Sequence, residues 1–88
     1  STASTTEAKT LADKIIIYPN PASDGFYVDG LESTATVSIV NIVGQQIITK
    51  QIENNEYVNI STLPAGMYLV KILHKGLSFE KKIIKDNN

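Results

Sequence analysis

Apolar and polar residues alternate with a period of two along most of the chain. Successive side chains of a β-strand point to opposite faces, so this period predicts strands that each bury one face. Turn-forming residues interrupt the pattern roughly every eight to twelve positions, as in antiparallel domains. The seven strands that we expect are residues 15–18, 26–30, 34–43, 46–53, 57–60, 67–74 and 77–85.

The third and sixth expected strands carry the longest apolar runs, and their alternation assigns residues to faces. We expect one face to contain Val37, Ile39 and Val43 in the third strand, and Tyr68, Val70 and Ile72 in the sixth. The opposite face of the third strand then contains Val40 and Ile42. No helical period longer than a turn or two is present, so the pattern predicts an all-β antiparallel sandwich or small barrel.

The chain divides at Ile15, where the composition changes. Residues 1–14 are rich in Ser, Thr, Ala, Lys and Glu, and Leu11 is their single large apolar residue. Such a composition buries too little apolar surface to remain ordered. We therefore expect a flexible linker to an upstream domain over residues 1–14 and one folded domain over residues 15–88.

Composition excludes several classes of function. The chain has 88 residues, of which 42% are hydrophobic, and a net charge of −1. It contains neither cysteine nor arginine, so we expect no disulfide, no thiolate metal site and no nucleic-acid partner. No apolar run approaches the roughly 18 residues that span a bilayer, so no membrane-spanning segment is expected.

Candidate catalytic residues are isolated. The single histidine, His74, precedes the Lys75-Gly76 turn, and we expect it to lie on the surface. The serines lack a nucleophile-elbow pattern, and Asp24 and Asp29 precede glycines without the spacing of a calcium loop. We therefore predict no enzymatic activity, no metal and no cofactor.

Tyrosines and terminal lysines each allow two interpretations. The tyrosines (Tyr18, Tyr27, Tyr57 and Tyr68) fit half-buried strand positions better than a sugar-stacking platform. The lysines near the end of the chain (Lys81, Lys82 and Lys85) either protect an edge strand from pairing or are bound by another protein.

Four motifs in order resemble one known family. They are YPNPASDGFYV (18–28), VSIVNIVGQQI (37–47), LPAGMYLVKI (63–72) and FEKKIIK (79–85). In this order and near the C-terminus they resemble the C-terminal sorting domain, type A, of proteins exported by the type IX secretion system of Bacteroidota. The resemblance spans residues 15–85 and departs from the family pattern at Met67 and in the tail Asp-Asn-Asn (86–88).

This resemblance implies a fold and a role. The family fold is an Ig-like β-sandwich of about seven antiparallel strands in two sheets. The implied role is a signal that directs an upstream cargo domain through the type IX outer-membrane translocon with its shuttle components. A sortase-like cell-surface peptidase then removes the domain, so the implied location is the periplasm in transit and then the cell surface or medium.

The resemblance also assigns roles to residues. Structural motif positions are Pro19, Asn20 and Pro21, which end the first strand; Asn41 and Gly44 in a hairpin; and Leu63, Pro64, Ala65, Gly66 and Tyr68 in a corner. The positions that the family associates with recognition by the machinery are Lys81, Lys82, Ile83, Ile84 and Lys85.

Two other classes remain open. An Ig-like adhesion or carbohydrate-binding module of a surface protein would use exposed aromatic residues, for which Tyr27 and Tyr57 are the candidates. A structural spacer would need neither the terminal lysines nor a position at the end of the chain. An enzyme is the least favoured class, because no acid/base pair or activated nucleophile is visible.

Overall fold

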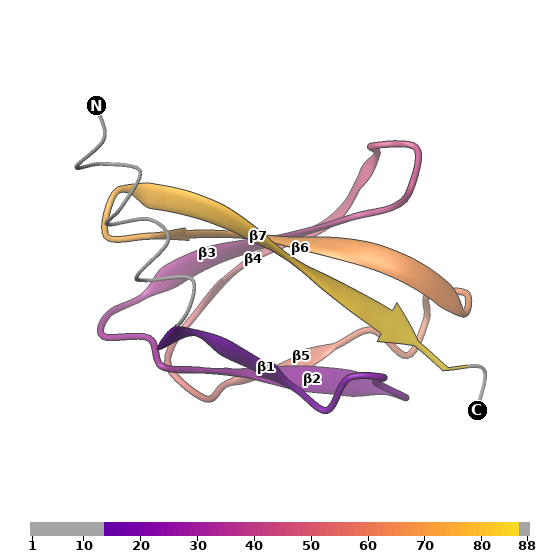
Figure 1. Ribbon diagram of the computed structural model, residues 1–88, viewed down its shortest axis with the longest axis horizontal. Helices are drawn as coiled ribbons and strands as arrows, with labels where there is room; N and C mark the ends of the chain where they lie inside the picture. The colour runs from indigo at the N-terminus through magenta and orange to yellow at the C-terminus, as the bar shows by residue number, and fades with distance from the viewer. Residues whose placement is uncertain (1–13, 87–88) are drawn as a thin grey trace.

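The computed structural model describes residues 14–86, which form two facing β-sheets (Figure 1). Their seven strands are β1 (Ile16–Tyr18), β2 (Gly25–Asp29), β3 (Ala35–Val40), β4 (Gln46–Ile52), β5 (Tyr57–Asn59), β6 (Gly66–His74) and β7 (Leu77–Lys85). The predicted all-β fold and strand number are confirmed. Residues 1–13, which make up nearly all of the predicted linker, lie outside the described part of the chain.

The smaller sheet has the strand order β1-β2-β5, and the larger has the order β4-β3-β6-β7. All strand pairs are antiparallel, and Figure 1 shows the two sheets as separate layers. β1 lies at a sheet edge and ends at Tyr18, immediately before Pro19, as the sequence predicts. Proline has no backbone donor, which suits this position.

The core lies between the two sheets and follows the period of two. Val70 and Ile72 on β6 are fully buried, while Met67 and Leu73 on the opposite face are about half exposed. This confirms the face assignment of the sixth strand. The smaller sheet contributes further buried side chains, among them Phe26, Val28 and Val58.

The third strand is shorter than predicted. It ends at Val40, and Ile42 and Val43 are 77% and 75% exposed in the turn that follows. The Oδ1 atom of Asn41 accepts hydrogen bonds from the backbone N–H groups of Val43 and Gln45. These local bonds replace the strand pairing, so the prediction that Val43 lies in this strand on the face of Val37 and Ile39 is wrong.

The position of His74 contradicts the prediction that this residue lies on the surface. Its side chain is 1% exposed, because it occupies the inward parity of β6 together with Val70 and Ile72. The backbone N–H of Glu32 donates to its Nε2 atom at 3.2 Å, and its Nδ1 atom has no partner among the described residues. The histidine is therefore a core residue and not a surface turn residue.

Candidate recognition edge formed by the terminal strand

The terminal strand β7 forms one edge of the larger sheet. It pairs with β6 along its whole length, from His74 opposite Leu77 to Gly66 opposite Lys85. In an antiparallel pair, alternate residues direct both backbone groups away from the partner strand. The Lys82 carbonyl and the Ile84 N–H are bonded to another part of the chain. The backbone N–H and C=O groups of the even-numbered residues of β7 therefore point away from β6.

Asn20 and Ala22 occupy the C-terminal half of this edge. The Asn20 side chain donates from Nδ2 to the Lys82 carbonyl at 3.2 Å and accepts from the Ile84 N–H at 3.1 Å. Ala22 continues the pairing in parallel, because its N–H donates to the Ile84 carbonyl and its carbonyl accepts from the Asp86 N–H. We call residues 20–22 the edge clamp. It links the end of β7 to the loop that follows β1.

The edge clamp joins the first of the four sequence motifs (18–28) to the last (79–85). Pro19 and Pro21 flank Asn20, and the peptide bond that precedes each proline is cis. Ala22, which sequence reasoning did not single out, is fully buried against the end of β7. The sequence carries no signal for this pairing, because an alanine in a loop does not indicate that it will pair with a strand about 60 residues away.

The corner before β6 meets the same end of β7. The Tyr68 hydroxyl donates to the Pro64 carbonyl at 2.5 Å, and the Tyr68 ring is buried. Leu63 packs partly buried against the core, and Gly66 begins β6 opposite Lys85. Three of the four motifs therefore meet at the C-terminal end of β7.

The remaining motif (37–47) pairs through Val37–Val40 with residues 69–72 of β6, and its hairpin tip projects from the same end of the sandwich. The Gly44 N–H donates to the Asn41 carbonyl at 3.0 Å, and Gly44 has a φ of 91°. Figure 1 shows the β3–β4 hairpin extending beyond the body of the sheet. Its tip exposes two large apolar side chains, Ile42 and Val43.

The terminal lysines differ in their surroundings. Lys85 is only 8% exposed, since it shares the inward parity of Ile83, so it is not an exposed edge lysine. Lys81 is half-buried on the inward face and Lys82 is exposed on the outward face. The ion pairs in the described region involve other lysines: Lys50–Glu56, Lys71–Glu80 and Lys75–Glu32. Lys81 and Lys82 therefore have no acidic partner within residues 14–86.

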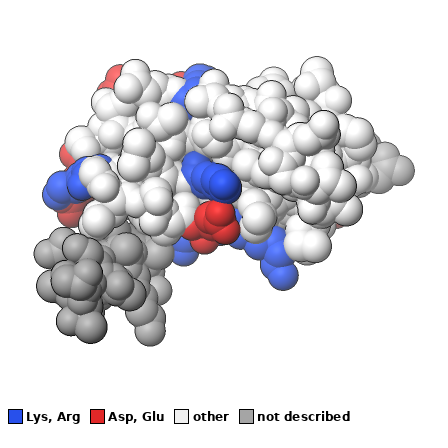
Figure 2. Space-filling model, turned by 90° about the horizontal axis from the view of Figure 1, so that it is seen from above, with Lys and Arg blue, Asp and Glu red and all other residues white. Residues whose placement is uncertain are grey.

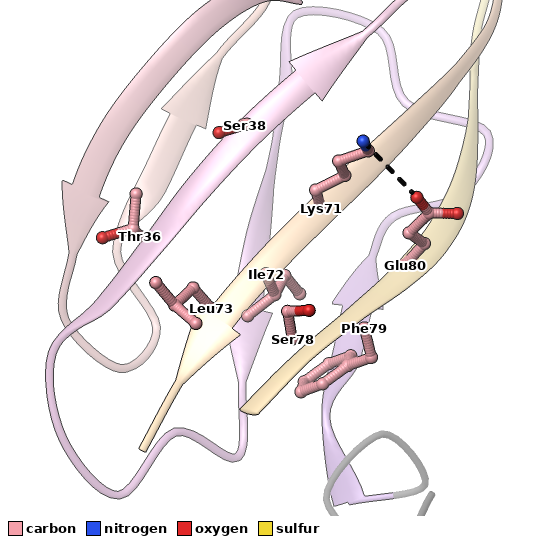
Figure 3. Close-up of a pocket in the computed structure, with 8 residues that line it drawn as sticks. All are labelled: Thr36, Ser38, Lys71, Ile72, Leu73, Ser78, Phe79 and Glu80. Atoms are coloured by element: carbon pink, nitrogen blue, oxygen red, sulfur yellow. Dashed lines mark ion pairs between the residues drawn. The ribbon is translucent and has the colours of Figure 1, made fainter. Parts of the chain in front are cut away.

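The outer face of the larger sheet is mostly uncharged, as the view from above in Figure 2 shows. A shallow groove of about 370 Å³ crosses β3, β6 and β7 there. In Figure 3, Lys71 and Glu80 extend toward each other across this groove, and Thr36, Ser38 and Leu73 lie nearby. An ion pair and the hydroxyl groups of Thr36, Ser38 and Ser78 on an open surface give no catalytic arrangement.

The tyrosines of the smaller sheet form a row. Tyr18, Tyr27 and Tyr57 are adjacent across β1, β2 and β5, each 37–39% exposed, with ring centroids 5.3 Å and 5.1 Å apart. The first pair of rings is stacked face against face. A sugar-binding platform instead presents ring faces to solvent. The row is therefore better explained by cross-strand packing than by glycan binding.

Two classes of feature are absent within residues 14–86. No group of three or more His, Asp or Glu side chains lies close enough to hold a metal ion. No helix in this part of the chain has the length and apolar character needed to cross a membrane.

Comparison with known proteins adds to this geometry. Residues 16–86 match the family described as the secretion system C-terminal sorting domain. In fold, the chain is similar to part of PorZ of Porphyromonas gingivalis, described as an essential bacterial surface component of the type-IX secretion system. The TM-score is 0.66 at 20% identity, over 91% of this chain and 12% of that chain. No significant match was found among curated proteins.

The structure defines a small antiparallel sandwich whose terminal strand is bonded to a Pro-Asn-Pro loop. The family match covers nearly all of the described residues, and the chain belongs to the family of type IX secretion system C-terminal sorting domains. The resemblance seen in the sequence is thereby confirmed. The chain corresponds to about an eighth of the length of the PorZ chain.

Proposed function

We propose that this domain is the export address of a larger protein and that the type IX outer-membrane translocon recognises it through β7 and its surroundings. The observation that carries the proposal is the family match over residues 16–86. The convergence of three sequence motifs on the end of β7 supports it. A folded sandwich presents this strand in one fixed arrangement, whereas the strand alone would not hold its shape.

Removal of the domain after transport is part of the same proposal. A sortase-like cell-surface peptidase cleaves before Ile15, within residues 1–14, and the cargo stays at the surface or is released. The position of Ile15 supports a boundary there, because its side chain is 1% exposed and belongs to the core. Cleavage upstream of Ile15 leaves the core of the domain intact.

Export of a reporter tests the proposal. Residues 1–88 are fused to the C-terminus of a periplasm-directed reporter in a Bacteroidota host, with the translocon intact or deleted. We expect the reporter at the cell surface or in the medium only when the translocon is intact. Mass spectrometry of the exported reporter then gives the cleaved bond, which we expect upstream of Ile15. A reporter that remains periplasmic although the domain is folded would exclude the sorting role.

A further inference from the structure

The edge of β7 has a second half that the edge clamp does not cover. The outward backbone groups of this half are the N–H and C=O of Ser78 and Glu80 and the N–H of Lys82, given the alternation established at Ile84. No hydrogen bond from a described residue outside the β6–β7 pair reaches Ser78 or Glu80. We call residues 78–82 the free edge. Unpaired edge groups of this kind are a template for strand addition.

The charges beside the free edge distinguish it from the other edge of the same sheet. On β4, Lys50 is paired with Glu56 at 3.1 Å. At the free edge, Lys81 and Lys82 are adjacent in sequence, point to opposite faces of the sheet and have no acidic partner among residues 14–86. Their cross-strand neighbours on β6, Val70 and Leu69, are apolar. An added strand would therefore lie between two unpaired positive charges, one on each face. The acid of the free edge, Glu80, is paired with Lys71 at 3.7 Å.

These charges also select among occupants. A second copy that pairs antiparallel over the whole free edge would place Glu80 opposite Glu80, and like charges opposite each other destabilise a strand pair. Lys81 and Lys82 would then lie opposite Phe79 and Ser78 and would gain no acidic partner. An acidic segment would instead neutralise the lysines while its backbone pairs with the free edge. The charge pattern thus disfavours self-association and favours an acidic partner strand.

We propose that the free edge, residues 78–82, binds an extended acidic segment of a partner protein as an added β-strand. Acidic side chains at two consecutive positions of that segment face Lys81 and Lys82 on opposite sides of the sheet. About five residues of partner chain span this length of edge. The assignment of that partner to the export machinery rests on the proposed function, whereas the binding mode is tested independently of export.

A peptide of defined sequence tests the binding mode. The probe is a capped eight-residue peptide of valine and threonine with two adjacent glutamates at its centre, added to the isotope-labelled chain of residues 1–88 at low salt. We expect saturable amide shifts and slower hydrogen exchange at Ser78, Glu80 and Lys82. Amides of β4 on the opposite edge should stay unchanged.

Two control peptides separate strand addition from simple charge attraction. The first has glutamine in place of both glutamates. The second keeps the glutamates but carries N-methyl groups at alternate residues, so that it cannot donate hydrogen bonds to the edge. We expect each change to weaken binding about tenfold or more, since it removes either two ion pairs or several backbone hydrogen bonds.

Matched variants of the chain complete the test. Lys81→Gln with Lys82→Gln should weaken binding of the glutamate peptide about tenfold. Lys14→Gln with Lys50→Gln removes the same net charge away from β7 and should leave binding within about twofold. Thermal midpoints of both double variants show whether each is folded. The N-methylated peptide tests the wild-type chain and therefore does not depend on the folding of any variant.

Three results would overturn the inference: no binding at low salt, equal binding of the N-methylated peptide, or shifts that do not centre on residues 78–82. Any of these, combined with translocon-dependent export of the reporter, removes the strand-addition mode and leaves the sorting role in place. Peptide binding at the free edge without export removes the sorting role and leaves the binding mode in place.

Discussion

Asn20 and Ile84 lie 64 residues apart in the sequence, and the Asn20 side chain accepts a hydrogen bond from the Ile84 backbone N–H at 3.1 Å. The same side chain donates to the Lys82 carbonyl, so one amide group pairs with β7 as a short piece of strand would. This relationship ties the loop after β1 to the last strand. It also limits the part of the β7 edge that is open to a partner.

Asn20→Ala tests the edge clamp. We expect a loss of about 1 to 2 kcal/mol in the free energy of unfolding, because two backbone groups of β7 lose their partner. The Ile84 amide should exchange faster with solvent. The control is Asn59→Ala, because within residues 14–86 the Asn59 side chain bonds only to Ser61 in the adjacent turn. Unchanged exchange at Ile84 in the Asn20 variant would show that the clamp does not hold β7.

Ile72 and Leu73 are neighbours on β6 whose side chains point to opposite faces of the sheet, so they provide a matched pair of variants. Ile72 is fully buried and Leu73 is 49% exposed. Ile72→Ala should cost about 3 kcal/mol through lost contacts and the cavity left behind. Leu73→Ala should cost less than about 1 kcal/mol. Urea denaturation measures both, and similar losses in the two variants would contradict the burial of this face.

Gly25 and Gly44 are glycines for different reasons. A Cβ atom at Gly25 would lie 2.4 Å from the Val58 carbonyl oxygen and 2.5 Å from the Tyr57 ring, whereas open space surrounds Gly44. Gly25→Ala should therefore cost about 2 to 3 kcal/mol by forcing β2 and β5 apart. Gly44→Ala should cost about 1 to 2 kcal/mol, because only its positive φ opposes a side chain. Denaturation midpoints that rank the two variants in reverse would contradict the close approach of β2 and β5.

Glu32 provides a prediction on pH. The hydrogen bond and charge of the Lys75 ammonium group hold the pKa of Glu32 below its usual value of 4.5. A pKa that is lower in the folded state means that this carboxylate stabilises the fold above its unfolded pKa. The contribution is lost as pH falls through the folded pKa. The difference in stability between the wild type and Lys75→Gln should therefore disappear in acid.

A carboxyl NMR titration of Glu32 checks this directly. In Lys75→Gln the pKa of Glu32 should rise toward its ordinary value, while that of Glu56 stays lowered. Glu56 serves as the internal control, because its pKa is lowered first by the Glu53 backbone N–H and then by Lys50. An unchanged Glu32 pKa in this variant would show that Lys75 is not its partner in solution.

The period of two was sufficient to predict the fold and most of the core, and it also contained information that the sequence-based interpretation did not use. His74 and Lys85 continue the inward parity of β6 and β7, and both are buried. Their polar character and their positions next to strand ends suggested exposure. In the structure, strand parity decides their burial.

Contacts between distant parts of the chain could not be predicted from any local pattern. The bonds of Asn20 and Ala22 to β7 depend on how the two sheets are placed against each other. The tyrosine row depends on the strand order β1-β2-β5 and its register. A sequence motif marks a residue as special, but the partner of that residue is set by tertiary structure.

The most direct test of the account is the fraction of the fused reporter found outside the cell. It is measured for the wild-type chain, for Lys81→Gln with Lys82→Gln, and for the control Lys14→Gln with Lys50→Gln. We expect translocon-dependent export of the wild type and the control, and periplasmic retention of the Lys81/Lys82 variant although it is folded. Equal export of all three would contradict recognition through the terminal strand, and retention of the folded wild type would contradict the sorting role itself.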